Sequence, residues 1–276
     1  MSRVGIFDSG VGGLSVWREI AARSPALETI YLADQAHIPY GPRGLEEIRD
    51  FSRGITRFLL AQGCGTVVLA CNTASAASLA ALRAEFPSVP FVGMEPAVKP
   101  AAATSRSRVA GVLATPATFQ GALFATTVER FAADVQLVQQ VCPGLVERIE
   151  AGELDGDGTE ALLRECLAPS LAAGADTIVL ACTHYPFVRH AIERIAGHGV
   201  HVIDPAPAIA KQVARVAGHA LATAPTAEPV FFTTGDTRVF EQVAGRLLQR
   251  PVRARHAHWR GSALHAEGSP QPTSPA

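Results

Sequence analysis

Short runs of apolar residues alternate along the chain with longer segments in which apolar residues recur at the spacing of an amphipathic helix. The runs are apolar throughout, which is typical of parallel strands that are covered on both faces. This alternation predicts strand–helix–strand units and an α/β fold with mostly parallel sheets. The expected strands are residues 4–7, 29–33, 66–70, 90–94, 108–114, 135–141, 177–181, 200–203 and 229–234.

Part of this pattern is repeated in the second half of the chain. "TVVLACNTASA" at residues 66–76 returns as "TIVLACTHYPF" at 177–187, and "RVGIFDSG" at 3–10 has a counterpart in "RVAGVLATP" at 108–116. The duplication predicts two pseudo-symmetric α/β domains. The segment 95–107, rich in Pro, Ala and Ser, is typical of a connection between them.

The expected first domain comprises residues 1–96 and 208–260, and the second comprises 97–207. This division assumes that the chain returns to the first domain after Asp204. Residues 261–276, "GSALHAEGSPQPTSPA", are expected to form a disordered tail. In open α/β sheets ligands bind outside the carboxyl ends of the strands, so the active site is expected in the cleft between the two domains.

Composition narrows the classes of function. The chain has 276 residues, 48% of them hydrophobic, and a net charge of −1. It is long enough for two cores, and it lacks the positive charge with which proteins neutralise nucleic-acid phosphates. No apolar stretch has the length of a signal peptide or a membrane helix. We therefore expect a cytoplasmic protein whose five cysteines are reduced, with no metal site, because no cysteines and histidines have the spacing of zinc ligands.

Two of the cysteines, Cys71 and Cys182, lie at the carboxyl ends of the duplicated strands, each before the expected start of a helix. The other three, Cys64, Cys142 and Cys166, are interpreted as ordinary core residues. Two facing domains would place a thiol on each wall of the cleft. A reducing compartment disfavours a disulfide between them, so we expect proton transfer instead. One thiol would remove a proton from a carbon atom, and the other would deliver a proton to the opposite face.

Polar residues accompany both thiols. Asp8 ends the first expected strand, and His184 lies two residues after Cys182, so either could orient a thiol or share its proton. Small polar residues occupy the turns from strand to helix, where they can cap the helix or bind a ligand with backbone N–H groups. Together they predict a site for a small carboxylic acid. They are Ser9, Asn72, Thr73 and Thr183.

Five sequence blocks resemble the signature of the glutamate racemase family, in order and at the expected spacing. They are "FDSGVGGLSV" (7–16), "IPYGPR" (38–43), "LACNTASA" (69–76), "LACTHYP" (180–186) and "FFTTGD" (231–236). The resemblance extends from about residue 3 to about residue 250. It implies two pseudo-symmetric α/β domains, an active site between them and no cofactor. It also implies interconversion of L- and D-glutamate, in which the D-enantiomer supplies bacterial peptidoglycan.

The resemblance also implies roles for individual residues. Cys71 would be the base for D-glutamate, assisted by Asp8, and Cys182 the base for L-glutamate, assisted by His184. Glu150 matches an acidic residue that the family places near the second thiol, although Glu147 competes for that match and either could be a plain surface residue. Substrate would be held through side chains and backbone by Asp8, Ser9, Tyr40, Gly41, Asn72, Thr73, Thr183 and His184.

The sequence argues against three other kinds of site. A dinucleotide site would need glycine where Ser15 stands. A pyridoxal-phosphate enzyme would need a Schiff-base lysine, and neither Lys99 nor Lys211 is placed for one. The histidines His256, His258 and His265 could suggest a metal site, but a solvated tail explains them better.

Two alternatives to a glutamate racemase remain. One is a racemase of the same superfamily that acts on aspartate or another amino acid. The other is a non-catalytic amino-acid-binding or regulatory protein on the same fold, although such a protein could spare one of the thiols. A small-molecule substrate is the expected partner, with no nucleic acid and no membrane. Homodimer formation is left open, as is binding of DNA gyrase, which is reported for some relatives.

Overall fold

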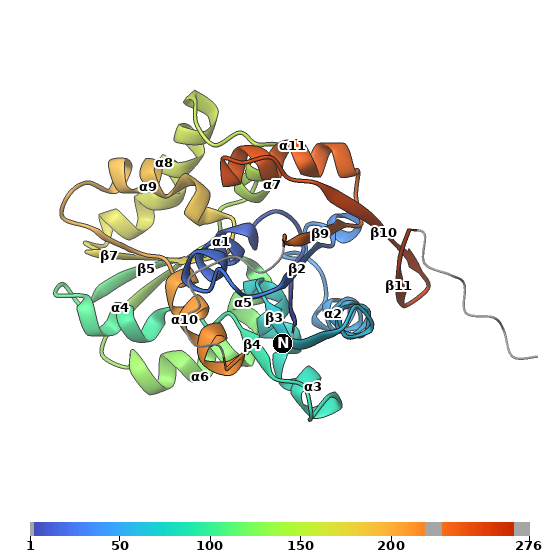
Figure 1. Ribbon diagram of the computed structural model, residues 1–276. Coiled ribbons are helices and arrows are strands. Elements are labelled where there is room, and N and C mark those ends of the chain that lie inside the picture. The colour runs from blue at the N-terminus through green and yellow to red at the C-terminus, as the bar shows by residue number, and fades with distance from the viewer. Residues whose placement is uncertain (1–2, 219–227, 268–276) are drawn as a thin grey trace, which may run out of the picture.

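A seven-stranded sheet is the larger of the two sheets in the computed structural model, which describes residues 3–218 and 228–267 (Figure 1). Its order is β11-β10-β9-β2-β1-β3-β4. All neighbours are parallel except β10 and β11, which form an antiparallel hairpin. The strands are β1 (Arg3–Asp8), β2 (Thr29–Ala33), β3 (Cys64–Leu69), β4 (Phe91–Gly93), β9 (Val230–Thr233), β10 (Ala254–Arg260) and β11 (Ala263–Ala266).

A second sheet of four parallel strands has the order β6-β5-β7-β8. This order repeats β2-β1-β3-β4 of the first sheet, with β5 in the place of β1 and β7 in the place of β3. The duplicated sequence therefore folds into duplicated topology. The strands are β5 (Val109–Ala114), β6 (Gln136–Gln140), β7 (Thr177–Ala181) and β8 (His201–Ile203).

Helices cover both faces of each sheet, as parallel strands without polar alternation require (Figure 1). On the first sheet, apolar residues of α1, α10 and α11 form one core, and those of α2 and α3 form another. On the second sheet, α7, α8 and α9 pack on one face, and α4 and α6 pack on the other. The bounds are α1 (Leu14–Arg23), α2 (Leu45–Ala61), α3 (Asn72–Glu85), α4 (Val98–Thr104), α6 (Ala122–Phe131), α7 (Leu145–Glu150), α8 (Asp157–Ala172), α9 (Arg189–Ala196), α10 (Ala206–Val216) and α11 (Thr237–Leu248).

Three short helices each follow the carboxyl end of a strand. The 3₁₀ helix η1 (Gln35–His37) follows β2, α5 (Pro116–Gln120) follows β5, and the 3₁₀ helix η2 (Tyr185–Val188) follows β7. They occupy the region where the two sheets present their carboxyl ends. The predicted fold class, two pseudo-symmetric α/β units with mostly parallel sheets, is confirmed.

Two expectations are wrong. Residues from Gly261 do not begin as a disordered tail, because residues 263–266 pair with β10 as strand β11, while 268–276 lie outside the described residues. The expectation of five reduced cysteines also fails. Cys142 and Cys166 form a disulfide, since packing of α8 beside β6 brings their Cα atoms to 5.5 Å. In residues 3–218 and 228–267, no helix has the length and hydropathy needed to cross a membrane.

Candidate active site

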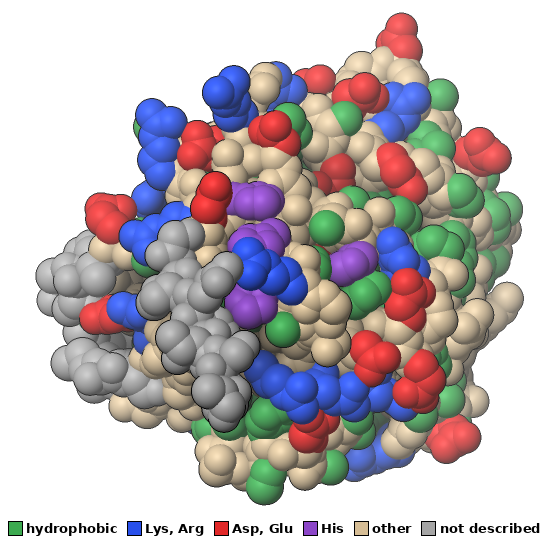
Figure 2. Space-filling model, turned by 90° about the vertical axis from the view of Figure 1, so that its right-hand side faces the viewer, with side chains coloured by type: hydrophobic (Ala, Val, Ile, Leu, Met, Phe, Trp, Pro, Cys, Tyr) green, Lys and Arg blue, Asp and Glu red, His purple; other side chains and the backbone are tan. Residues whose placement is uncertain are grey.

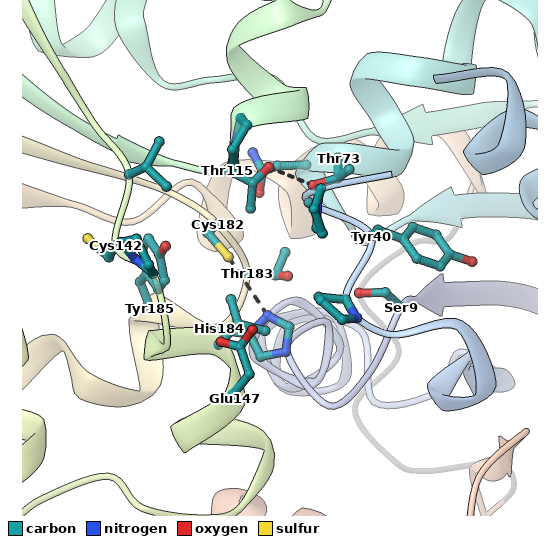
Figure 3. Close-up of a pocket in the computed structure, with 18 of the residues that line it drawn as sticks. Ser9, Tyr40, Thr73, Thr115, Cys142, Glu147, Cys182, Thr183, His184 and Tyr185 are labelled. Atoms are coloured by element: carbon teal, nitrogen blue, oxygen red, sulfur yellow. Dashed lines mark hydrogen bonds between the residues drawn. The ribbon is translucent and has the colours of Figure 1, made fainter. Parts of the chain in front are cut away.

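Both duplicated cysteines line one cavity of about 260 Å³. Cys71 reaches it from the turn between β3 and α3, and Cys182 reaches it from the turn between β7 and η2. Each sheet therefore contributes one thiol. The two thiols lie at the carboxyl ends of β3 and β7, which hold equivalent positions in the two sheets. Figure 3 shows Cys182 and His184 on one side of the cavity, with Ser9 and Tyr40 across from them.

Cys71 is the N-cap residue of α3. Its sulfur accepts a hydrogen bond from the backbone N–H of Ala74 at 3.5 Å, so the thiol sits on the positive end of a 14-residue helix. The side chain is buried. Burial raises the pKa of Cys71 well above its ordinary value, and the charge of Asp8 raises it further. Cys71 therefore holds its proton at neutral pH.

A series of polar contacts joins Cys182 to His184 and then to Glu150. The Cys182 Sγ atom lies 3.8 Å from Nδ1 of His184, and Nε2 of His184 lies 2.6 Å from Oε1 of Glu150. Burial alone would lower the pKa of His184, but its hydrogen bonds to Cys182 and Glu150 outweigh that effect and hold the pKa well above its ordinary value. His184 therefore keeps a second proton beside the Cys182 sulfur.

Asp8 joins the two halves of the site. It is fully buried; one carboxylate oxygen accepts hydrogen bonds from the Ser9 hydroxyl and the Gly10 N–H, and the other accepts from the Thr183 hydroxyl at 2.8 Å. Burial raises the pKa of Asp8, while the charge of His184 and the hydrogen bonds from Gly10 and Thr183 oppose the rise. The carboxylate thus holds the loop that carries Cys182 against the end of β1.

Two glycines after β1 allow the side chains of Glu150 and His184 to approach this closely. A Cβ atom at Gly10 would lie 2.0 Å from Oε1 of Glu150, and one at Gly12 would lie 2.4 Å from Nδ1 of His184. Both positions must therefore lack a side chain. The backbone N–H of Val11, between them, donates to Oε1 of Glu150 at 2.7 Å.

Asn72 and Thr73, at the start of α3, line the same cavity. Among the described residues, neither polar atom of the buried Asn72 amide has a hydrogen-bond partner. A buried amide without partners costs about 1–3 kcal/mol, so Asn72 is prepared to bind a polar ligand. The Thr73 hydroxyl lies 2.8 Å from the Thr115 hydroxyl, which connects the first sheet to the second (Figure 3).

Tyr40 and Gly41 lie on the loop after η1. The Tyr40 ring points away from the cavity, and its hydroxyl donates to the buried carboxylate of Asp34 at 2.7 Å (Figure 3). The Tyr40 hydroxyl is therefore already used and does not face the cavity that Tyr40 lines. Gly41 packs against Thr115, where an added Cβ would lie 3.2 Å from the Thr115 Cβ.

The structure separates the two candidate glutamates. Glu150 contacts His184 directly, whereas Glu147 is exposed and lines the cavity without a hydrogen bond to the Cys182–His184 pair among the described residues. Sequence reasoning missed several residues that touch the site. Long-range contacts alone reveal Gln35 and Thr115. The short spacing from Cys182 could have indicated Tyr185, and the glycine spacing after β1 could have indicated Gly10 and Gly12.

The raised pKa of Cys71 predicts how this thiol reacts with an alkylating agent. Only the thiolate reacts, and its fraction grows about tenfold per pH unit below the pKa. We expect the rate at which iodoacetamide labels Cys71 to climb steadily from pH 7 to pH 9.5, as followed by peptide mass mapping. For a cysteine in an unfolded peptide, the labelling rate should bend near the ordinary pKa of about 8.5 and then approach a plateau. A Cys71 rate that bends and levels off in the same way would contradict the assigned shift.

The three C-terminal histidines lie on the β10–β11 hairpin. Figure 2 shows histidine side chains gathered on this face. His258 is paired across the hairpin with His265, and it is stacked on His256 at 6.1 Å between ring centroids. In the part of the chain that the structure describes, no group of three or more His, Cys, Asp or Glu side chains is arranged to hold a metal ion.

Comparison with known proteins identifies the family. The model of the Asp/Glu/hydantoin racemase family matches residues 7–213. The chain is 52% identical over 250 residues to a glutamate racemase of Pseudomonas aeruginosa, covering 90% of this chain and 94% of the relative.

Solved structures agree with this assignment. Glutamate racemase of Escherichia coli, crystallised with L-glutamate and the activator UDP-MurNAc-Ala, superposes with a TM-score of 0.81 at 30% identity, covering 97% of this chain and all of the other. Glutamate racemase of Francisella tularensis, crystallised with D-glutamate, gives a TM-score of 0.80 at 27% identity, covering 94% and 97%. The chain belongs to the Asp/Glu/hydantoin racemase family.

Proposed function

We propose that this protein is a glutamate racemase that moves the α-proton with two cysteines and without a cofactor. The observation that carries the proposal is the pair of buried thiols, Cys71 and Cys182, which line one cavity from two different sheets. Inversion at carbon needs a base on one face and an acid on the other. Like residues suit both roles, because the roles exchange when the reaction runs backwards.

The protonation states of Cys71 and His184 favour one starting form of the active site. Cys71 holds its proton because burial raises its pKa, and His184 holds a proton beside Cys182. In this form the Cys182 sulfur takes the α-proton of L-glutamate, and the electron pair of the broken C–H bond stays on the α-carbon. The Cys71 thiol then gives its proton to the opposite face. The product complex, with Cys71 as thiolate and Cys182 as thiol, is the form that takes D-glutamate.

The rest of the cavity favours an amino acid with acidic groups. The N-terminus of α3 presents backbone N–H groups and a helix dipole to the cavity, and both attract a carboxylate. The unpartnered amide of Asn72 adds a donor at the same end, whereas the hydroxyls of Ser9 and Thr183 donate to Asp8 and offer acceptor lone pairs to an amino group. Relatives named glutamate racemase, at about half identity over most of the chain, support glutamate in particular. The D-glutamate formed would supply peptidoglycan synthesis.

Racemisation measured by circular dichroism tests the substrate. With no added cofactor, we expect kcat/KM for L-glutamate to exceed that for L-aspartate by about 10- to 200-fold, the discrimination that one methylene group commonly provides. Equal or faster turnover of aspartate would favour the aspartate racemase alternative. Binding of either amino acid with no turnover would favour the non-catalytic binding protein.

A further inference from the structure

Gln35, the first residue of η1, makes a contact that the proposed mechanism has not used. Its Nε2 atom donates a hydrogen bond of 2.9 Å to Oε2 of Glu150, across from the first sheet to α7 of the second. The other oxygen of Glu150, Oε1, receives the Val11 N–H and His184 Nε2. Both oxygens of the carboxylate that supports His184 are therefore held by donors, and Gln35 fixes Oε2.

The orientation of the Gln35 amide is itself fixed. The Thr233 hydroxyl, buried at the end of β9, donates to Oε1 of Gln35 at 2.8 Å, and the backbone N–H of Gly235 donates to the Thr233 oxygen at 3.0 Å. A flipped amide would turn its oxygen toward the Glu150 carboxylate and lose that hydrogen bond. Because an ionised carboxylate only accepts hydrogen bonds, the amide nitrogen faces Glu150, and the Thr233 hydroxyl then donates to the amide oxygen.

Gly235 also limits where Gln35 can lie. A Cβ atom at Gly235 would lie 2.9 Å from the Gln35 Cβ, so a side chain there would displace it. Two residues of the "FFTTGD" block, Thr233 and Gly235, thus support the Gln35 side chain rather than touching the cavity, since neither lines it.

We propose that Gln35 is a positioning residue for proton transfer at Cys182, acting through Glu150 and His184. The inference rests on the proposed glutamate racemase function. Gln35 holds the Glu150 carboxylate in line with His184 Nε2, and His184 Nδ1 in turn faces the Cys182 sulfur. Among the described residues no comparable hydrogen bond joins Gln35 to Cys71, so its effect should fall on one of the two proton transfers.

The test compares the two directions in Gln35→Leu with α-deuterated substrates. A slower Cys182 step makes removal of the α-deuteron of L-glutamate more rate-limiting, so the primary isotope effect on kcat/KM should rise for L-glutamate. It should fall toward 1 for D-glutamate, whose α-deuteron Cys71 removes. We expect kcat/KM itself to fall about 10- to 100-fold, the range for a lost hydrogen bond to a charged group. It must fall equally in both directions, because the two enantiomers are equally stable.

A merely structural role for Gln35 would reduce kcat/KM and leave both isotope effects unchanged. The matched control is Gln242→Leu, at an exposed position on α11, which should keep the native rate and isotope effects. If Gln35→Leu folds poorly, Thr233→Val leaves Gln35 in place and frees its amide to turn; it should shift the isotope effects in the same opposed directions by smaller amounts. Unchanged or parallel isotope effects in folded Gln35 and Thr233 variants would overturn the proposal.

A second readout needs no substrate. The ¹⁵N signals of the His184 imidazole, assigned by their loss in His184→Asn, should move in Gln35→Leu and stay in place in Gln242→Leu. Unmoved signals in Gln35→Leu would show that Gln35 does not influence His184, whatever the substrate is. If the signals move but the native protein fails to racemise glutamate, the proposed function falls and the positioning contact stands.

Discussion

Replacing either Cys71 or Cys182 by serine should lower the racemisation rate of glutamate by about 10³- to 10⁴-fold in both directions. The loss is near the upper end of what a positioned acid or base contributes. An alcohol is a far weaker acid than a thiol, and the burial that already raises the pKa of Cys71 would disfavour an alkoxide even more. Initial rates from each enantiomer, followed by circular dichroism, measure the effect.

Cys64→Ser is the matched control for these variants. Cys64 is also a buried free cysteine, on β3 itself, and it does not line the cavity. The same thiol-to-alcohol change should leave the rate per folded molecule near native, with the folded fraction taken from thermal unfolding. Substantial two-way turnover by either single-site variant would contradict the two-base assignment. So would a loss in Cys64→Ser as large as that in Cys71→Ser.

Replacing Glu150 by glutamine should lower kcat by about 10²- to 10³-fold, within the usual range for acid–base groups. The amide keeps the size of the side chain but removes the negative charge 2.6 Å from His184 Nε2. Since that hydrogen bond and charge help to raise the pKa of His184, the pKa should fall and the imidazole should lose its second proton at lower pH. The alkaline limb of the kcat profile should therefore move to lower pH.

Glu147→Gln distinguishes a specific effect from a general loss of negative charge near the cavity. Glu147 is three residues away on the same helix and also lines the cavity, but it is exposed and makes no hydrogen bond to His184 among the described residues. We expect its kcat to stay within a few-fold of native, with no shift of the alkaline limb. A loss in Glu147→Gln equal to that in Glu150→Gln would overturn the choice between these two glutamates.

The sequence predicted the buried strands well because each is apolar on both faces. β1, β3, β5 and β7 all fall within a residue or two of the expected runs. β10 was missed because its sequence, "ARHAHWR", is largely polar. This strand lies near the edge of the sheet, where burial of both faces is not required. Because β10 was not predicted, its partner β11 was also missed, and residues from Gly261 were wrongly expected to form a disordered tail.

The sequence could identify site residues that are repeated or close together along the chain, but not those joined only by long-range contacts. Duplication marked Cys71 and Cys182, and local spacing placed Asp8 and His184 beside them. Gln35 could not be identified in this way, because its contacts with Glu150 and Thr233 span 115 and 198 positions of the chain. The disulfide was missed for the same reason, since it depends on how α8 packs beside β6.

Isotope incorporation in D₂O tests the central claim most directly. The protein is incubated with L-glutamate without a cofactor, and early samples are analysed for the α-hydrogen of each enantiomer. Two bases on opposite faces predict D-glutamate that carries solvent deuterium at the α-carbon, while the remaining L-glutamate keeps its original proton. D-glutamate that retains the substrate proton would show that one group serves both faces. L-glutamate that exchanges with no change in optical rotation would show that the second thiol does not deliver a proton. Either result would contradict the two-cysteine mechanism.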